Sequence, residues 1–98
     1  MFRKINNDCV ESSEGFIVEF FGMHHVRYIE GDRAASIEVE GGTNKNDQVY
    51  FEIYPQTLKG WLPPYEYEFI ASEKKERILK NIDDALTFLG IRHIIGKE

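Results

Sequence analysis

The side chains of this sequence best suited to chemistry are three histidines and one cysteine. His24 and His25 are adjacent, while His93 and Cys9 lie far from them along the chain. Successive side chains of a strand point to opposite faces, so the adjacent imidazoles cannot easily share one metal ion. No spacing in this set matches a structural zinc motif. The set predicts no metal site, and the histidine pair is interpreted as flanking a turn or lying on the surface.

Cys9 is a poor candidate for a nucleophile. A catalytic cysteine needs a histidine partner and surroundings that stabilise the thiolate. Asp8 and Glu11 flank Cys9 and would raise its pKa, so an inert thiol is expected. The glycines match no phosphate-binding spacing, and the glutamates on the alternating segments are interpreted as solvated. The sequence therefore predicts no catalytic residue and no cofactor.

Composition and charge favour a small folded protein. The 98 residues predict a single domain over 1–98, and 42% hydrophobic content is enough for a packed core. The net charge of −5, with scattered basic residues, argues against direct nucleic-acid binding. An acidic balance suits a basic partner, although solubility alone also explains it.

The sequence also predicts a soluble cytoplasmic protein. The N-terminal residues contain no apolar core of a signal peptide, and no stretch approaches the roughly 20 apolar residues of a membrane span. A lone cysteine excludes an internal disulfide and fits a reducing compartment.

Apolar periodicity sets the expected elements. Alternation of apolar and polar residues predicts strands over 16–21, 24–29, 34–40, 48–54 and 65–70. In the last of these, Tyr65, Tyr67 and Phe69 would share a face. Apolar residues at helical spacing predict a helix from about Ser72, its expected N-cap, to Leu89, and Gly90 would then be a left-handed C′ residue. Residues 91–95 predict a final short strand.

These elements predict an α+β fold, an antiparallel β-meander with one long C-terminal α-helix packed on one sheet face. Short links between successive strands favour antiparallel pairing. The helix would cover the side chains at 35, 37, 39, 49, 51 and 53.

Two surface patches are the candidate binding sites. The opposite sheet face would carry Glu38, Glu40, Tyr50, Glu52 and Tyr54, with Asp47 in the adjoining loop. Tyrosines beside carboxylates suit an interface that engages Arg or Lys, and the alternative is a solvated face with cross-strand tyrosine packing. The second patch is Trp61, Tyr65, Glu66 and Glu68. Trp61 is also interpreted as a plug at the sheet–helix junction.

After a strand-rich N-terminal half, one segment of the sequence carries a resemblance to a known family. This segment runs from Trp61 and Pro63-Pro64 through Glu76-Arg77-Ile78-Leu79-Lys80-Asn81-Ile82 to Ala85-Leu86 and Phe88-Leu89-Gly90. It resembles the small immunity proteins of bacterial polymorphic toxin systems, in particular those of contact-dependent growth inhibition. The resemblance implies a non-enzymatic antitoxin that occludes the C-terminal toxin domain, here a nuclease, of a secreted effector, and a free protein that is monomeric.

Two alternatives remain open from the sequence. One is a small metal- or ligand-binding protein or enzyme that uses His24, His25 or His93. The other is a structural subunit that forms homo-oligomers through an exposed strand edge.

Overall fold

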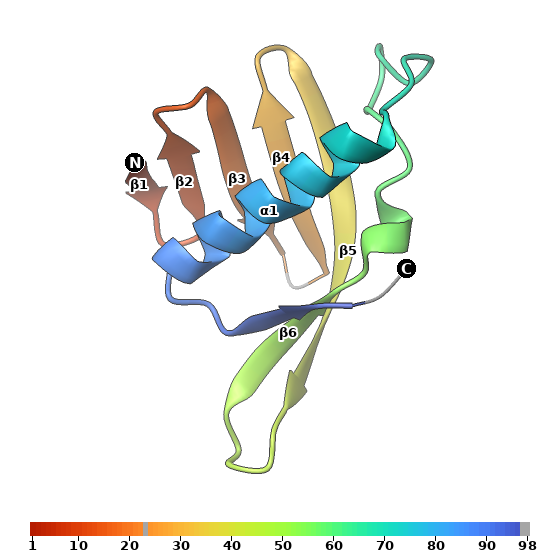
Figure 1. Cartoon of the computed structure of the whole chain (residues 1–98). Helices are drawn as coiled ribbons and strands as arrows, with labels where there is room; N and C mark the ends of the chain where they lie inside the picture. The colour runs from red at the N-terminus through yellow and green to blue at the C-terminus, as the bar shows by residue number, and fades with distance from the viewer. Residues whose placement is uncertain (23, 97–98) are drawn as a thin grey trace.

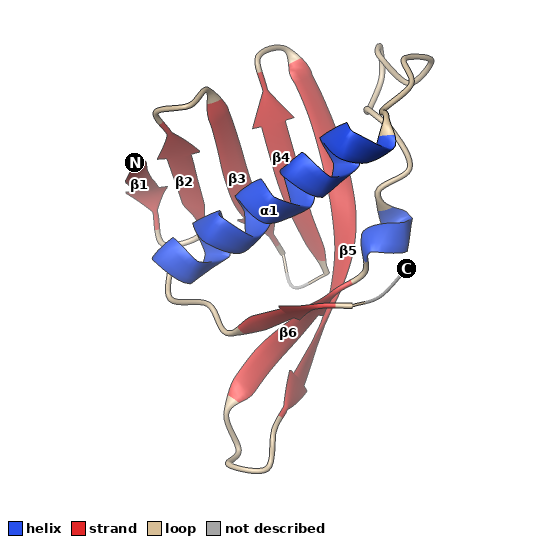
Figure 2. Cartoon of the chain, viewed as in Figure 1, coloured by secondary structure: helices blue, strands red, loops and turns tan. Residues whose placement is uncertain are grey.

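The computed structural model describes residues 1–22 and 24–96, and this part of the chain forms seven strands, one 3₁₀ helix and one α-helix (Figures 1 and 2). The strands are β1 (Phe2–Asn6), β2 (Cys9–Ser12), β3 (Phe16–Phe21), β4 (His25–Glu30), β5 (Arg33–Thr43), β6 (Val49–Ile53) and β7 (His93–Ile95). The helices are η1 (Pro55–Thr57) and α1 (Ser72–Phe88). The predicted α+β class is confirmed. No helix in the described part of the chain is long and apolar enough to cross a membrane.

The seven strands form one sheet in sequence order. Each strand from β1 to β6 pairs antiparallel with the next, and β7 pairs parallel with β6. The long strand β5 changes partner along its length: it pairs with β4 up to Glu38 and with β6 from Val39 onward. Figure 1 shows the far end of the β5–β6 hairpin extending away from the part of the sheet that α1 crosses.

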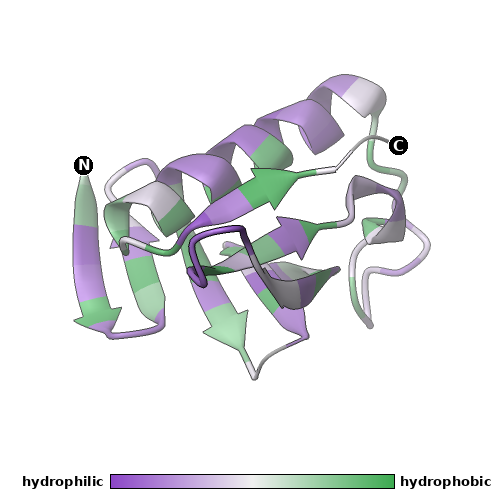
Figure 3. Cartoon of the chain, turned by 90° about the horizontal axis from the view of Figure 1, so that it is seen from below, coloured by the Kyte–Doolittle hydropathy of each residue, from purple (hydrophilic) through white to green (hydrophobic). Residues whose placement is uncertain are grey.

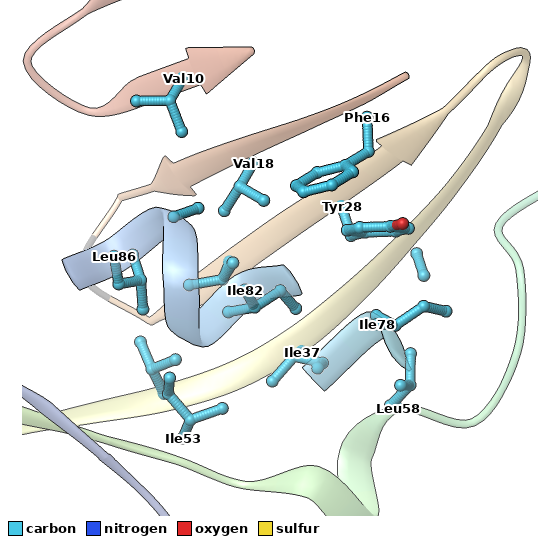
Figure 4. Close-up of a cluster of buried hydrophobic side chains, with 14 of the residues drawn as sticks. Val10, Phe16, Val18, Tyr28, Ile37, Ile53, Leu58, Ile78, Ile82 and Leu86 are labelled. Carbon is cyan, nitrogen blue, oxygen red and sulfur yellow. The ribbon is translucent and has the colours of Figure 1, made fainter. Parts of the chain in front are cut away.

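The core lies between α1 and the sheet face turned toward it (Figure 4). Ile78, Ile82 and Leu86 of the helix are fully buried, as their helical spacing predicts. They meet alternate residues of the strands, including Ile37 and Ile53. Full burial of an aliphatic side chain of this size stabilises a fold by roughly 1.5–3 kcal/mol relative to exposure.

Two of the six sheet residues expected under the helix are not fully covered. Val49 is 55% exposed, and Phe51 is only partly buried against Phe20, whose ring centre lies 4.7 Å away. Both belong to the hairpin that extends beyond the helix. Alternation predicts which face a residue occupies, but the reach of α1 decides how much of that face is covered.

The N-terminal strands β1 and β2 were not expected from the sequence. Apolar residues are sparse in the segment Phe2-Arg3-Lys4-Ile5-Asn6, and four of these five residues are exposed because β1 is an edge strand. Phe2 nevertheless packs against Phe16 and Phe88, with ring centres 5.9 and 5.5 Å away. The first strand is therefore held by the two aromatic contacts of Phe2 and by pairing with β2 rather than by an alternating pattern.

The predicted strand over 65–70 is wrong. This segment forms consecutive turns, in which the Tyr65 N–H donates to the Leu62 carbonyl and the Glu68 N–H to the Tyr65 carbonyl, each at 3.0 Å. Tyr65 and Glu68 also bond to side chains of the β4–β5 turn. Local turns and these distant side-chain contacts replace the ladder hydrogen bonds that the aromatic alternation suggested.

The ends of α1 agree only in part with the sequence. Gly90 has φ of +76°, which confirms the left-handed residue expected after the helix. The N-cap is Ala71, not Ser72, and no side chain caps the first turn. The helix start is instead tied to the sheet: Lys74 Nζ donates to both carboxylate oxygens of Glu30, at 2.9 and 2.6 Å. A tertiary ion pair therefore anchors the first turn where a cap was expected.

The ion pair between Glu30 and Lys74 predicts a loss of stability in acid. Burial pushes the pKa of Glu30 upward, but hydrogen bonds from Lys74 and Tyr28 outweigh it and hold the folded-state pKa below its ordinary value. The carboxylate therefore contributes fully above its unfolded pKa of about 4.3, and its contribution is lost as pH falls through the lower folded-state pKa. The free energy of unfolding in urea should fall more steeply with acid for the wild type than for Glu30→Gln.

The control is the same comparison in a Lys74→Met background, where the pH-dependent difference should be much smaller because the partner is gone. A difference between wild type and Glu30→Gln that stays constant from pH 7 to pH 3 would contradict the prediction.

Candidate functional site

The outer sheet face of β5 and β6 gathers five of the predicted site residues. We call this surface the acidic face, and it consists of Glu38, Glu40, Tyr50, Glu52 and Tyr54. Glu40 and Glu52 lie directly opposite each other in the antiparallel pair, and Tyr50 lies opposite Gly42. The Tyr54 hydroxyl donates to Oε2 of Glu40 at 3.3 Å. Figure 3 shows the alternation of polar and apolar residues along the strands that produces this face.

The carboxylates of the acidic face are not neutralised by ion pairs. No salt bridge within residues 1–22 and 24–96 involves Glu38, Glu40 or Glu52. Like charges directly opposite each other on paired strands are destabilising. Partial desolvation, followed by the charges of Glu40 and Glu52, raises the pKa of Tyr54. Within the described residues these carboxylates therefore lack a salt-bridge partner, which an added cation would supply.

Tyr50 gives the acidic face apolar area at a fixed position. A Cβ atom at Gly42 would lie 3.5 Å from its ring atoms, so the ring rests against the backbone of the neighbouring strand. Rings placed this way lose little freedom on binding, which suits an interface.

Asp47 lies apart from the acidic face. It occupies the turn at the hairpin tip with φ of +59°, and its N–H donates to the Asn44 carbonyl at 3.1 Å. The last pair before this turn, Thr43 and Val49, lies three residues, or about 10 Å of strand, beyond Glu40 and Glu52. The position of Asp47 is thus explained by the left-handed backbone that the turn needs.

The second predicted patch is divided by the structure. Trp61 is 8% exposed and belongs to the core, which agrees with its interpretation as a plug. Tyr65 and Glu68 contact the β4–β5 turn: Arg33 donates from Nε and Nη2 to the two oxygens of Glu68, both at 2.8 Å. The Tyr65 hydroxyl donates to Asp32 at 2.6 Å. Only Glu66 lies exposed without such a contact.

Two exposed aromatic residues do not lie where the alternation of the sequence predicts. Tyr67 and Phe69, expected to share a strand face with Tyr65, are 93% and 88% exposed. Their exposure depends on turns and on the Arg33–Glu68 pair, whose members are 35 residues apart in the sequence. No local pattern signals such a contact, although the neighbouring Pro63-Pro64 marks the segment as irregular.

The residues considered for catalysis lie in separate parts of the fold. His25 lies opposite Glu38 on the outer sheet face, and His24 belongs to the preceding turn. Both ring nitrogens of His93 are engaged, Nδ1 with the Ile91 carbonyl at 2.7 Å and Nε2 with Asp83 at 2.6 Å. Burial, then the charges of Glu19 and Glu11, raises the pKa of Cys9, so its thiol is poorly nucleophilic at neutral pH.

A groove of about 780 Å³ lies between the β5–β6 hairpin tip and the end of α1. Its lining residues are Thr43, Asn44, Lys45, Tyr50, Thr87, Gly90, Ile91, Arg92, His93 and Ile94. The lining contains no carboxylate, and the imidazole of His93 is already engaged. The groove therefore lacks the paired acid and base that hydrolytic chemistry needs.

The family model for immunity protein 74 matches residues 17–95, about four fifths of the chain. The chain belongs to this family. No curated protein and no solved structure gave a match. The matched range contains β3 to β7 and α1, and it includes both the acidic face and the segment with Tyr67 and Phe69.

Membership in the immunity protein 74 family confirms the resemblance to toxin-system immunity proteins. Such a protein has a cognate toxin as its partner and neutralises it. A binding role accounts for surfaces that are costly to the free protein, such as the opposed carboxylates of Glu40 and Glu52. It requires no catalytic group.

The opposed carboxylates predict that a charge reversal stabilises the free protein. Glu52→Lys replaces a repulsive cross-strand pair with an attractive one, so we expect the free energy of unfolding in urea to rise by up to about 1 kcal/mol. The gain should shrink in 0.5 M salt.

The matched control is Glu14→Lys, which makes the same charge change in the exposed β2–β3 turn, away from the acidic face. An equal gain in both variants would show that net charge alone is responsible and would refute a local repulsion between Glu40 and Glu52.

Proposed function

We propose that this chain is the cytoplasmic antitoxin of a contact-dependent growth inhibition system and that it occludes the toxin domain through its acidic face. The observation that supports this most directly is the pair of opposed carboxylates, Glu40 and Glu52, neither of which forms a salt bridge within residues 1–22 and 24–96. In the free protein this arrangement is unfavourable. An Arg or Lys from a partner would turn the repulsion into charge-assisted hydrogen bonds.

The tyrosines fit the same partner. Tyr50 and Tyr54 flank the two carboxylates and offer apolar area beside them, the combination found at binding hot spots. Arginine engages both groups at once, since its planar guanidinium pairs with a carboxylate and stacks on an aromatic ring. The preferred partner surface is therefore basic and rich in arginine.

A nuclease is the toxin that best matches this surface. A protein that binds the phosphate backbone presents Lys and Arg in its substrate groove. An acidic face placed over that groove would exclude nucleic acid, and opposite charges would also speed association. Inhibition of this kind is stoichiometric, with one immunity protein for each toxin domain.

The acidic face predicts that Glu52→Lys weakens toxin binding while it stabilises the free protein. Binding would be measured by titration calorimetry against the toxin domain encoded just upstream, at 50 and at 300 mM salt. We expect 1:1 binding of the wild type that weakens with salt. Because one favourable ion pair is lost and a repulsion is introduced, the variant should bind at least tenfold more weakly, about 1.4 kcal/mol.

Glu14→Lys again serves as the control, because it lowers the net negative charge equally and leaves the acidic face intact. Its affinity should stay within about threefold of the wild type, which is roughly 0.6 kcal/mol. Equal losses in both variants, or none in either, would refute the acidic face as the docking surface. A wild-type protein that does not bind the toxin domain would refute the function itself.

A further inference from the structure

The segment 62–70, which we call the aromatic loop, places two large aromatic side chains almost entirely in solvent. Tyr67 is 93% exposed and Phe69 is 88% exposed. Single exposed apolar side chains are common on protein surfaces. Here two of them lie two residues apart on one loop. Figure 1 shows the connection between η1 and α1 projecting beyond the start of the helix.

The aromatic loop is held in place at several points. Its Leu62 N–H donates to the Ala34 carbonyl of β5 at 2.7 Å. Trp61, which precedes the loop, and Ile70, its last residue, are both buried in the core. The backbone that carries Tyr67 and Phe69 is therefore fixed on both sides.

A cluster around Arg33 fixes the middle of the loop. The guanidinium donates two hydrogen bonds to Glu68 and lies 4.2 Å from the centre of the Tyr65 ring. The Tyr65 hydroxyl donates to Asp32 at 2.6 Å. A bidentate pair combined with a cation–π contact restrains orientation as well as distance. Tyr67 and Phe69 flank Glu68 in the sequence, so the loop holds their backbone in a defined conformation before any partner arrives.

The surroundings of the exposed aromatics are acidic. Asp32, Glu66 and Glu68 contribute three negative charges and Arg33 one positive charge, which leaves a net −2 around the loop. The hydrogen bond from Tyr65 lowers the pKa of Asp32, and that from Arg33 lowers the pKa of Glu68, so both stay ionised at neutral pH. A second copy of this loop would be repelled by the same charges.

We propose that Tyr67 and Phe69 form a second anchor for the toxin domain, and that they insert into an apolar pocket with a basic rim. This inference rests on the proposed function for the identity of the partner. Interface hot spots are rich in aromatic residues, and a preorganised loop loses little conformational entropy when it binds. The charge around the loop has the same sign as the acidic face, so both surfaces fit a basic partner.

The anchor is a separate contact from the acidic face. Arg33 alternates in step with Ala35 and Ile37 and so lies on the helix side of β5, whereas Glu38 and Glu40 lie on the opposite side. Arg33 and Glu40 are also about 24 Å apart along the strand. A toxin domain that contacts both surfaces must therefore reach around the edge of β5, which the segment 54–62 lines through hydrogen bonds to Ala34 and Glu38.

The test is a double variant, Tyr67→Ala with Phe69→Ala, titrated against the toxin domain encoded just upstream. Both side chains are solvent-exposed, so the thermal midpoint should not change, and a loss of affinity reports binding rather than folding. We expect the dissociation constant to rise at least tenfold while its dependence on salt stays that of the wild type, because the acidic face is intact. Phe88→Ala, a half-exposed aromatic residue at the other end of α1, is the control and should keep the wild-type affinity.

The outcomes separate this inference from the proposed function. An unchanged affinity of the double variant, alongside weakened binding by Glu52→Lys, would overturn the second anchor and leave the acidic face standing. A double variant that alters self-association in sedimentation but not toxin affinity would also overturn it, since the occupant would then be a second copy. Wild-type protein that fails to bind the toxin domain would overturn both.

Arg33→Gln tests the positioning role of the cluster. This change removes the bidentate pair with Glu68 and the contact with Tyr65 but keeps the side chains of Tyr67 and Phe69. We expect the affinity for the toxin domain to fall about threefold or more, because the complex dissociates faster. In the Tyr67→Ala, Phe69→Ala background the same change should have no further effect, because there is no anchor left to position. Equal losses in the two backgrounds would show that Arg33 acts independently of the aromatic loop and would overturn its positioning role.

Discussion

The contact between the apolar stripe of α1 and one face of the sheet is the constraint on which the rest of this structure depends. Ile78, Ile82 and Leu86 are fully buried in that contact. Once one sheet face is committed to the helix, the pleat forces the alternate residues outward. The acidic face is therefore a geometric result of core packing: wherever Ile37, Val39 and Ile53 point inward, glutamates and tyrosines of β5 and β6 must point outward. The proposed binding surface and the core are two sides of the same strands.

The sequence predicted those parts of the fold in which a residue's environment follows from its neighbours. Helical spacing located α1, and alternation placed Glu40, Glu52 and Tyr54 together on one face. The same rule failed for residues 65–70, because alternation is necessary for a half-buried strand but does not supply a pairing partner. The exposure of Tyr67 and Phe69 depends on Arg33, which is distant in the sequence, and no local pattern reveals such a contact. Strand β1 was missed because an edge strand needs few apolar residues.

The two surfaces reflect different ways of preparing for a partner. At the acidic face the free protein retains an unfavourable pair, Glu40 opposite Glu52, whose repulsion a cation would relieve. At the aromatic loop the free protein is already ordered. The ion pair of Arg33 with Glu68 and the buried side chains of Trp61 and Ile70 hold the backbone that carries the two exposed rings. The first arrangement favours recognition by charge, and the second favours recognition by shape. If both proposed surfaces engage the toxin, charge would speed the encounter and the preorganised rings would slow release.

The parallel pairing of β7 has a consequence for how the fold is acquired. The strands from β1 to β6 are joined by short connections, so each hairpin closes with little loss of chain entropy. Strand β7 instead pairs Phe51 with His93, across η1, the aromatic loop and all of α1. Among the strand pairings this one spans by far the longest stretch of sequence, so its closure costs the most chain entropy. The stretch of chain that it closes contains the loop that presents Tyr67 and Phe69, and any partner held by those rings is therefore held by a segment anchored at both of its ends.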